Sequence, residues 1–383
     1  MKQNKTLLVF DEVLSGHHLE YIHHLYLGAK EFQNIRLIFA VPKTFSEMKE
    51  KLSWEEQSNV LFHFIEEKEL NEIEGNTFML SYKKCALADE IAKIYSADEI
   101  FFISLMNCLP SVIFRCRNKI KISGIVYLIY LYRWNNSNWI LKLEDIVKYC
   151  IFKYCKRFKS IYLLNDDISP RYLNKKFDTN IFLSLIDPVM PFISPPDTTW
   201  RNKLGISPEK KIFLHTGSLS ERKGTLNILK ALLLLPDELL SKYTIVFAGK
   251  VGIDIFDSFY EMCKQLQSKV ELFVYDEFCD FESIISMCAC ADFILIPYQN
   301  VESSSGIIGY ASSTCTPVVA PKNGLLGKLV RKYKLGILLE DSTVPSLKSF
   351  FQEAYSYKLK INSSYHQERT VDLFARTIFQ KYV

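Results

Sequence analysis

The stretch FLHTGSLSERKG, residues 213–224, decides the fold class of the chain. Apolar residues that suit a buried strand lead into a polar loop, and two cations, Arg222 and Lys223, then stand where a helix begins. The free N–H groups and the dipole at the amino end of a helix favour an anion, and the cations add full positive charge. A diphosphate is the natural ligand of such a turn. The alternative interpretation is a helix start whose cations are merely solvated.

A second strand-loop-helix unit follows in FILIPYQNVESSSG, residues 293–306. Small residues with accessible backbone amides open its helix, an arrangement that again suits an anion: Ser303, Ser304, Ser305 and Gly306. Glu302 stands just before them, where a carboxylate can accept hydrogen bonds from sugar hydroxyls. Its alternative interpretation is an ordinary acid near the amino end of a helix.

Apolar runs that suit strands alternate with helical windows along the chain. The expected strands are 6–10, 35–41, 60–64, 99–103, 122–127, 161–164 and 181–185, followed by 212–216, 244–248, 270–274, 293–296, 317–320 and 336–339. Such alternation predicts an α/β fold with mainly parallel sheets that are covered by helices.

The length of 383 residues exceeds what one core usually organises, so two domains are expected. The densest group of prolines, within residues 187–196, separates the two series of strands and predicts the linker. We therefore expect an N-terminal domain over residues 1–188, a C-terminal domain over residues 189–365 and a final amphipathic helix within residues 366–383.

The two turns, in this order and at this distance, resemble the donor domain of the family 4 retaining glycosyltransferases. The family pattern begins with a glycine, a short loop and Lys-Gly, which fall on Gly217 and Lys223-Gly224. It continues with an acid, a glycine-rich loop and Pro-Val-Val, which fall on Glu302, Gly306 and residues 317–319. The resemblance implies the GT-B fold, in which two Rossmann-like domains face each other across an interdomain cleft and the last helix returns to the N-terminal domain.

Over residues 211–340, the resemblance implies that a nucleotide sugar binds the C-terminal domain as co-substrate, with no other cofactor. Lys223 would stabilise the departing nucleotide diphosphate and Glu302 would hold sugar hydroxyls, so both are candidate catalytic residues. The expected donor-binding set is Gly217, Ser218, Arg222, Lys223, Glu302, Ser303, Ser304, Ser305, Gly306 and Tyr310. The expected reaction is transfer to a glycan or lipid-linked acceptor with retention, in surface polysaccharide biosynthesis.

Two positions depart from the family pattern. The family has arginine after the first glycine, where this chain has Ser218, so one phosphate contact is either absent or made by Arg222. The second acid of the family, which holds the ribose, falls on Tyr310, whose phenol bonds a hydroxyl less strongly than a carboxylate does. These departures support an alternative: a catalytically weak GT-B relative that binds a glycan or nucleotide sugar as a partner within an assembly complex.

The segment SGHH, residues 15–18, follows the first strand and opens the first helix. By the resemblance, Gly16 lies where the N-terminal domain approaches the donor, and His17 or His18 faces the cleft. Both histidines are therefore candidate catalytic residues, and Gly16 and Arg133 are expected on the acceptor side. The alternative is a helix start that is merely polar.

No metal site is expected, because the chain has no Asp-x-Asp triplet, its cysteines lack zinc-site spacing and its N-terminal histidines are not spaced for a shared ion. The net charge of +4 is small for this length, so bulk charge does not suggest a nucleic-acid partner.

A cytoplasmic location is expected, because the first residues, MKQNKTLLVFDEV, do not form a signal-peptide pattern and the cysteines suit a reducing compartment. Residues 148–159 mix aromatic side chains and cations, which suits peripheral contact with the inner face of a membrane. The alternative is a helix whose lysine stems extend around a buried aromatic face.

Overall fold

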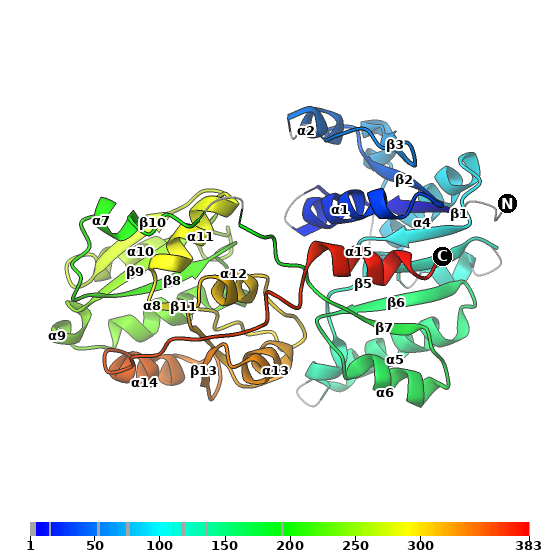
Figure 1. Ribbon diagram of the computed structural model, residues 1–383. Helices are drawn as coiled ribbons and strands as arrows, with labels where there is room; N and C mark the ends of the chain where they lie inside the picture. Colours follow the sequence, from blue (N-terminus) through cyan, green and yellow to red (C-terminus); the bar gives the residue numbers. More distant parts are fainter. Residues whose placement is uncertain are drawn as a thin grey trace. The chain divides into compact units, whose positions relative to one another are not determined.

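The computed structural model describes residues 5–14, 17–51, 54–73, 77–109, 111–115, 119–134, 137–192 and 195–382. The chain divides into two compact units (Figure 1): unit 1 comprises Met1–Pro188 with Thr370–Val383, and unit 2 comprises Val189–Arg369. The chain therefore passes between the units twice. The two passages meet where the N–H of Val189 donates to the carbonyl of Arg369 at 2.8 Å.

Unit 1 is built on a parallel sheet with the described strand order β3-β2-β1-β4-β5-β6-β7. Its strands are β1 (Lys5–Phe10), β2 (Ile35–Pro42), β3 (Val60–Ile65), β4 (Glu99–Phe102), β5 (Lys121–Val126), β6 (Phe158–Leu164) and β7 (Phe182–Leu185). Successive residues of β1, from Leu7 to Val9, are fully buried. Both faces of the sheet are thus covered at its centre, as the continuous apolar runs of the sequence predict.

The described helices and 3-10 turns of unit 1 are α1 (His17–Gly28), η1 (Ala29–Glu31), α2 (Phe45–Lys51), α3 (Glu67–Asn71), α4 (Thr77–Ile94), η2 (Leu105–Cys108), η3 (Ser111–Arg115), η4 (Tyr130–Arg133), α5 (Trp139–Tyr154), α6 (Ser169–Phe177) and α15 (Val371–Phe379). Asn138 caps α5 by accepting a hydrogen bond from the N–H of Leu141 at 2.9 Å.

Residues 148–159 do not form one helix, because α5 ends at Tyr154 and β6 begins at Phe158. Two of the cations of this segment are held by acids of unit 1. Arg157 is 2% exposed and pairs with Asp89 at 2.6 Å, and Lys159 pairs with Glu99 at 2.8 Å. The expected row of cations and aromatics is therefore split between a helix and a strand.

The last helix, α15, packs against the first, α1, although most of the chain lies between them (Figure 1). The rings of Tyr21 and Phe374 stack at 5.2 Å, and Arg376 pairs with Glu31 at 2.7 Å. The helix starts later than residue 366, because Thr370 caps it by accepting a hydrogen bond from the N–H of Leu373.

Unit 2 contains a parallel sheet with the order β10-β9-β8-β11-β12-β13. Its strands are β8 (Lys211–Thr216), β9 (Tyr243–Ala248), β10 (Glu271–Tyr275), β11 (Phe293–Leu295), β12 (Val318–Pro321) and β13 (Gly336–Leu339). The helices and turn are α7 (Trp200–Lys203), η5 (Glu221–Lys223), α8 (Thr225–Leu233), α9 (Asp237–Leu240), α10 (Phe256–Leu266), α11 (Phe281–Cys290), α12 (Ile307–Ser313), α13 (Gly324–Tyr333) and α14 (Val344–Ala354).

The predicted α/β class with parallel sheets is confirmed, and each expected strand lies at or within a few residues of an observed one. In unit 2 the chain runs from β8 outward to β10 and then returns to β11 on the other side of β8. The connections after β8 and β11 therefore run in opposite directions along the sheet, and in open α/β sheets ligands bind at the carboxyl ends of strands where such a reversal occurs. Aromatic side chains pack between these two strands, where the ring of Phe213 on β8 stacks on that of Phe293 on β11 with their centroids 5.6 Å apart.

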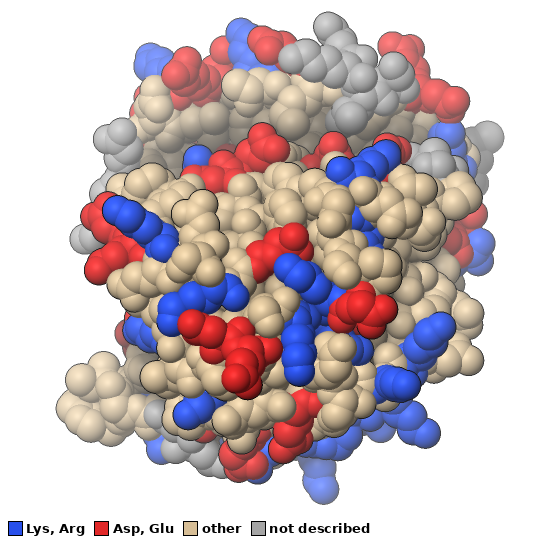
Figure 2. Space-filling model, turned by 90° about the vertical axis from the view of Figure 1, so that its left-hand side faces the viewer, with Lys and Arg blue, Asp and Glu red and all other residues tan. Residues whose placement is uncertain are grey.

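On the described part of the face shown in Figure 2, Lys and Arg side chains are interspersed with Asp and Glu. This distribution agrees with the small net charge of the sequence. Within the described residues, none of the helices has the length and apolar character needed to cross a membrane.

The contact between α1 and α15 provides a test of packing. A Cβ built on Gly28 would lie 2.2 Å from the Cβ of Ala375, so the helices meet where one residue has no side chain. Gly28→Ala should gain about 1 kcal/mol of helix propensity. Overpacking should nevertheless make the variant less stable, by about 1–3 kcal/mol in the free energy of unfolding measured with urea.

The matched control is the swap Gly28→Ala/Ala375→Gly, which moves the methyl group from one helix to the other. Its loss in the free energy of unfolding should be smaller than the sum of the losses in the two single variants. Strict additivity of the two substitutions would show that the methyl groups do not compete for this space.

Candidate active site

Lys223 folds back over Gly217 at the carboxyl end of β8. Gly217 has φ 96°, and Gly224, which precedes α8, has φ 75°. A Cβ on Gly217 would lie 2.5 Å from Nζ of Lys223, so a glycine leaves room for the ammonium group. The same Nζ lies 5.4 Å from the ring centroid of Tyr298. A cation thus stands beside the amino end of α8, whose dipole favours anions in the same place.

His215, the second-last residue of β8, joins three segments beneath this lysine. It is fully buried, with Nδ1 at 2.8 Å from the Leu295 carbonyl and Nε2 at 3.0 Å from Oγ1 of Thr225. Thr225 Oγ1 also accepts a hydrogen bond from the N–H of Ser220. The consistent assignment is a neutral ring that donates from Nδ1 and accepts at Nε2. Burial, with Lys223 as a further cause, lowers the pKa of His215 to about 4.

Gln299 connects the loop after β11 to the loop after β8. Its backbone N–H donates to the carbonyl of Arg222 at 2.9 Å, and its Nε2 donates to the carbonyl of Glu221 at 2.8 Å. Tyr298, next to it, is buried and its hydroxyl lies 3.0 Å from Oγ of Ser305. The two turns that the sequence singled out are therefore one connected structure.

Glu302 lies in the second turn and is half-buried. Its Oε2 accepts a hydrogen bond from the N–H of Val301 at 3.1 Å. The carbonyl of Val301 accepts from Leu325 at 2.9 Å, and a Cβ on Gly324 would lie 2.5 Å from that carbonyl. The start of α13 therefore supports the segment that carries the carboxylate.

The other expected donor residues lie around these two turns. Ser305 is buried and its Oγ accepts from the N–H of Ile307 at 3.3 Å, whereas Ser303 donates to Asn300 at 3.1 Å. Gly306 immediately precedes α12, and Ser304 is half-buried before it. Tyr310, on α12, packs edge-on against Phe281 at 5.4 Å.

Ser218 and Arg222 are both exposed on the first turn. Ser218 directly follows Gly217, and Arg222 is part of η5, where its carbonyl is the group that Gln299 binds. The position directly after the first glycine, where the family has arginine, is thus occupied by Ser218, and the arginine of this turn directly precedes Lys223.

In unit 1, His18 forms a short contact with a buried acid. Its Nδ1 lies 2.7 Å from Oδ2 of Asp11, which follows β1 and is 1% exposed. Burial raises the pKa of Asp11, although the hydrogen bond and charge of His18 act in the opposite direction. The ring of His18 lies 6.0 Å from that of Tyr127, which follows β5.

Further polar residues follow β6 and β7 at this carboxyl edge of the sheet. Tyr21 of α1 donates to Oδ1 of Asp187 at 2.6 Å, and the N–H of Asp187 donates to Asn165 at 3.0 Å. Parallel strands bring their carboxyl ends to one edge, which is why residues distant in sequence meet here.

Three further residues were expected near the acceptor or the cleft: Gly16, His17 and Arg133. Gly16 lies outside the described residues, and of His17 only the backbone, at the start of α1, is described. Arg133 makes a two-point ion pair with the fully buried Asp145, at 2.7 and 3.1 Å, and its guanidinium lies 4.2 Å from the ring centroid of Tyr130. Arg133 therefore holds α5 in place.

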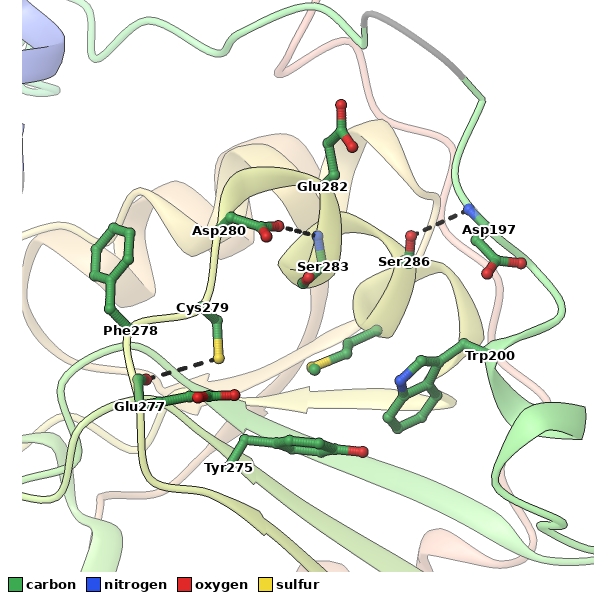
Figure 3. Close-up of a pocket in the computed structure, with 11 residues that line it drawn as sticks. Asp197, Trp200, Tyr275, Glu277, Phe278, Cys279, Asp280, Glu282, Ser283 and Ser286 are labelled. Atoms are coloured by element: carbon green, nitrogen blue, oxygen red, sulfur yellow. Dashed lines mark hydrogen bonds between the residues drawn. The ribbon is translucent and has the colours of Figure 1, made fainter. Parts of the chain in front are cut away.

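A separate pocket of about 360 Å³ lies between α7, β10 and α11 (Figure 3). Two of its polar side chains are used in local structure: Asp280 caps α11 through the N–H of Ser283 at 2.7 Å, and Ser286 accepts from the N–H of Asp197 at 3.1 Å. None of the expected donor residues lines this pocket.

Within the part of the chain that the structure describes, no three His, Cys, Asp or Glu side chains gather in a way that could hold a metal ion.

Residues 196–360 match the family described as Glycosyl transferases group 1. Most of unit 2 is therefore similar to the group 1 glycosyltransferases. The matched segment contains both turns, with Lys223 and Glu302, so the similarity of this segment to glycosyltransferases is confirmed.

The whole chain is similar to solved structures at low identity. A glycosyltransferase from Rickettsia africae ESF-5 is 15% identical with a TM-score of 0.66, over 100% of this chain and 98% of that chain. Anabaena Alr3699/HepE, in complex with UDP and glucose, is 16% identical with a TM-score of 0.68, over 98% and 99%. WaaG, a glycosyltransferase involved in lipopolysaccharide biosynthesis, is 14% identical with a TM-score of 0.64, over 97% and 95%.

These likenesses, together with the two parallel sheets, confirm the predicted GT-B fold. No curated protein matches the chain.

Sequence reasoning missed three residues of unit 2: His215, Tyr298 and Gln299. The sequence contained one signal for His215, because a histidine inside an otherwise apolar strand requires buried partners. Gln299 binds backbone carbonyls, which carry no mark in the sequence, so its role depends on the fold.

The buried imidazole of His215 predicts that the stability of the protein depends on pH. The folded pKa of about 4 lies below the ordinary value of 6.5, so the unfolded chain binds more protons between these values. The stabilisation is fully present above pH 6.5 and is lost as the pH falls to about 4, a change of about 3 kcal/mol.

His215→Gln should remove this part of the pH dependence, because the amide does not titrate. Urea unfolding at a series of pH values, on the parent and the variant, measures the difference. The same slope in both proteins between pH 4 and 6.5 would show that another group is responsible.

Proposed function

We propose that the chain transfers a sugar from a nucleotide-sugar donor to a glycan or lipid-linked acceptor, with retention at the anomeric carbon and without a metal, in surface polysaccharide biosynthesis. The observation that carries the proposal is the position of Lys223, which is folded over Gly217 at the carboxyl end of β8, in a turn that Gln299 connects to the turn of Glu302. The UDP and glucose bound to HepE and the pathway of WaaG support the substrate class and context.

The positive charge that the reaction needs comes from this chain's own groups. A departing nucleotide diphosphate develops negative charge on its oxygens, and a fixed ammonium group stabilises that charge without reorganisation. Lys223 lies beside the amino end of α8, whose helix dipole acts in the same sense. We therefore assign the diphosphate to Lys223 and to this helix end.

Glu302 is assigned to the sugar. A carboxylate accepts hydrogen bonds from hydroxyls, and Gln299, in the same loop, connects the segment of Glu302 to that of Lys223. The remaining residues of the expected donor set belong to the same two turns, except Tyr310, which is on α12.

The acceptor is assigned to the carboxyl edge of the sheet of unit 1. His18 and Asp11 form its best-defined polar pair, and a buried acid that is hydrogen-bonded to a partly exposed imidazole fixes the orientation of that ring. Gly16 and His17 belong to the same proposed region by sequence, whereas Arg133 is assigned to the support of α5.

The roles of Lys223 and Glu302 predict separable effects. Lys223→Ala should weaken the binding of both the nucleotide diphosphate and the intact donor by about tenfold or more, because a charge-assisted contact is lost. Glu302→Ala should leave the binding of the free diphosphate unchanged and should lower the rate of transfer. A thermal-shift panel of nucleotide sugars identifies the donor, and calorimetry with initial rates then measures both variants.

The matched control is Lys230→Ala, which removes an exposed cation from α8 and should change neither quantity. Unaltered diphosphate affinity in Lys223→Ala would show that the donor site is elsewhere.

All assays contain EDTA, and transfer that returns only with added magnesium or manganese would refute the metal-independent part of the proposal. Donor binding with no turnover in the parent would favour the alternative, a binding partner.

The His18–Asp11 pair in unit 1 predicts a change in the rate of transfer without a change in donor affinity. His18→Ala and Asp11→Asn should each lower the rate of transfer about tenfold or more while the donor affinity stays unchanged, because both act on the acceptor side. The control is His63→Ala, which removes an imidazole of β3 that contacts the hydroxyl of Tyr95. Full activity in both site variants would leave His18 as part of a polar helix start.

A further inference from the structure

Helix α5 presents an apolar face to solvent. At the helical period, residues 139, 140, 143, 146, 147, 150 and 154 share one side, and all are apolar, aromatic or cysteine. The six large ones, Trp139, Ile140, Leu143, Ile146, Val147 and Tyr154, are between 45% and 73% exposed. A surface helix normally shows the opposite arrangement, with its charged residues outward.

The orientation of α5 is fixed by a charged residue on its inner side. Asp145 is fully buried and is held by two hydrogen bonds from Arg133, with Nζ of Lys148 at 3.9 Å. Turning the apolar stripe inward would expel this carboxylate from its partners, and breaking a buried ion pair is strongly unfavourable. The ion pair of Asp145 and Arg133 therefore keeps the apolar stripe of α5 on the solvent side.

Cations border the stripe and continue onto the neighbouring helix. Lys142 and Lys153 lie along one border of the stripe, and Nζ of Lys153 lies 5.7 Å from the ring centroid of Phe177 on α6. Along the other border, Glu144 is paired with Lys148 at 3.3 Å. Figure 1 shows α5 and α6 next to each other at one edge of unit 1. Helix α6 contains no acid and exposes more cations and apolar side chains: Ile168 just before it, Arg171, Tyr172, Lys175 and Lys176.

We propose that the outer face of α5, together with α6, docks on an anionic lipid surface. An interfacial helix needs an apolar face to enter the acyl boundary and cations at its border to meet acidic headgroups. Trp139 and Tyr154, at the two ends of the stripe, are the residue types that favour the membrane–water interface. The excess of cations around the stripe is the feature that selects an anionic surface over a neutral one.

This surface overlaps only in part with the one expected from the sequence, sharing residues 150, 153 and 154. In residues 148–159, Arg157 and Lys159 are held by Asp89 and Glu99, so those cations are engaged within unit 1. The docking surface instead begins at Trp139 and uses the side of α5 that faces away from the sheet. The proposal does not depend on the transfer reaction, because its readout is binding to lipid.

Flotation of the full chain with vesicles tests the proposal. Vesicles of phosphatidylcholine with about a third phosphatidylglycerol should bind the chain about tenfold more strongly than phosphatidylcholine alone, and added salt should weaken the binding. Leu143→Glu/Ile146→Glu should weaken it by about tenfold or more, since two charges would enter the acyl boundary. Both side chains are about half exposed, so the fold should persist, which circular dichroism and thermal unfolding check.

The matched control is Ile94→Glu/Ile253→Glu, which adds the same charge at apolar positions that are 69% and 98% exposed on α4 and after β9. Its vesicle binding should equal that of the parent. The proposal is overturned if the parent fails to bind anionic vesicles or if the Leu143/Ile146 variant binds as well as the parent. Sedimentation that shows a dimer in the parent and a monomer in that variant, without vesicle binding, would assign the face to a second copy of the chain.

Discussion

The hydrogen bonds of the neutral His215 are the constraint on which the arrangement of the two turns of unit 2 depends. Strands β8 and β11 are neighbours in the sheet but lie far apart in the sequence, and the connections after them run in opposite directions along the sheet. His215 joins the end of β11, through the Leu295 carbonyl, to the start of α8, through Thr225. Because the ring is buried, an unpaired nitrogen would cost far more than each satisfied bond contributes, so the arrangement is kept as a whole.

The same burial explains why this histidine can lie beneath a lysine. A charged imidazole below Lys223 would add like-charge repulsion to the cost of desolvation, and both effects lower the pKa of His215. The ring therefore stays neutral and leaves the ammonium group as the local positive charge. On the outer side, Gln299 adds two exposed hydrogen bonds between the same loops, which are individually modest but set the register of one turn against the other.

Unit 1 shows how charged residues orient helices. Asp145 is drawn inward by Arg133, and α5 consequently turns its apolar side outward. At the opposite end of the chain, α15 returns to α1 where Gly28 leaves space for Ala375, and the hydroxyl of Tyr382 donates to the buried Glu99 at 2.6 Å. The first and last helices thus belong to one unit.

The sequence by itself determined the strands, the division into two series and the two turns that carry Lys223 and Glu302. These features are local: parallel strands covered on both faces read as continuous apolar runs, and a glycine before a helix marks a turn whatever surrounds it. The tertiary structure alone decided the partners of His215, the carbonyls bound by Gln299, the burial of Arg157 beside Asp89 and the inward position of Asp145. Periodicity reveals that a helix has an apolar side, but which side meets the sheet depends on partners that only the fold brings within hydrogen-bond distance.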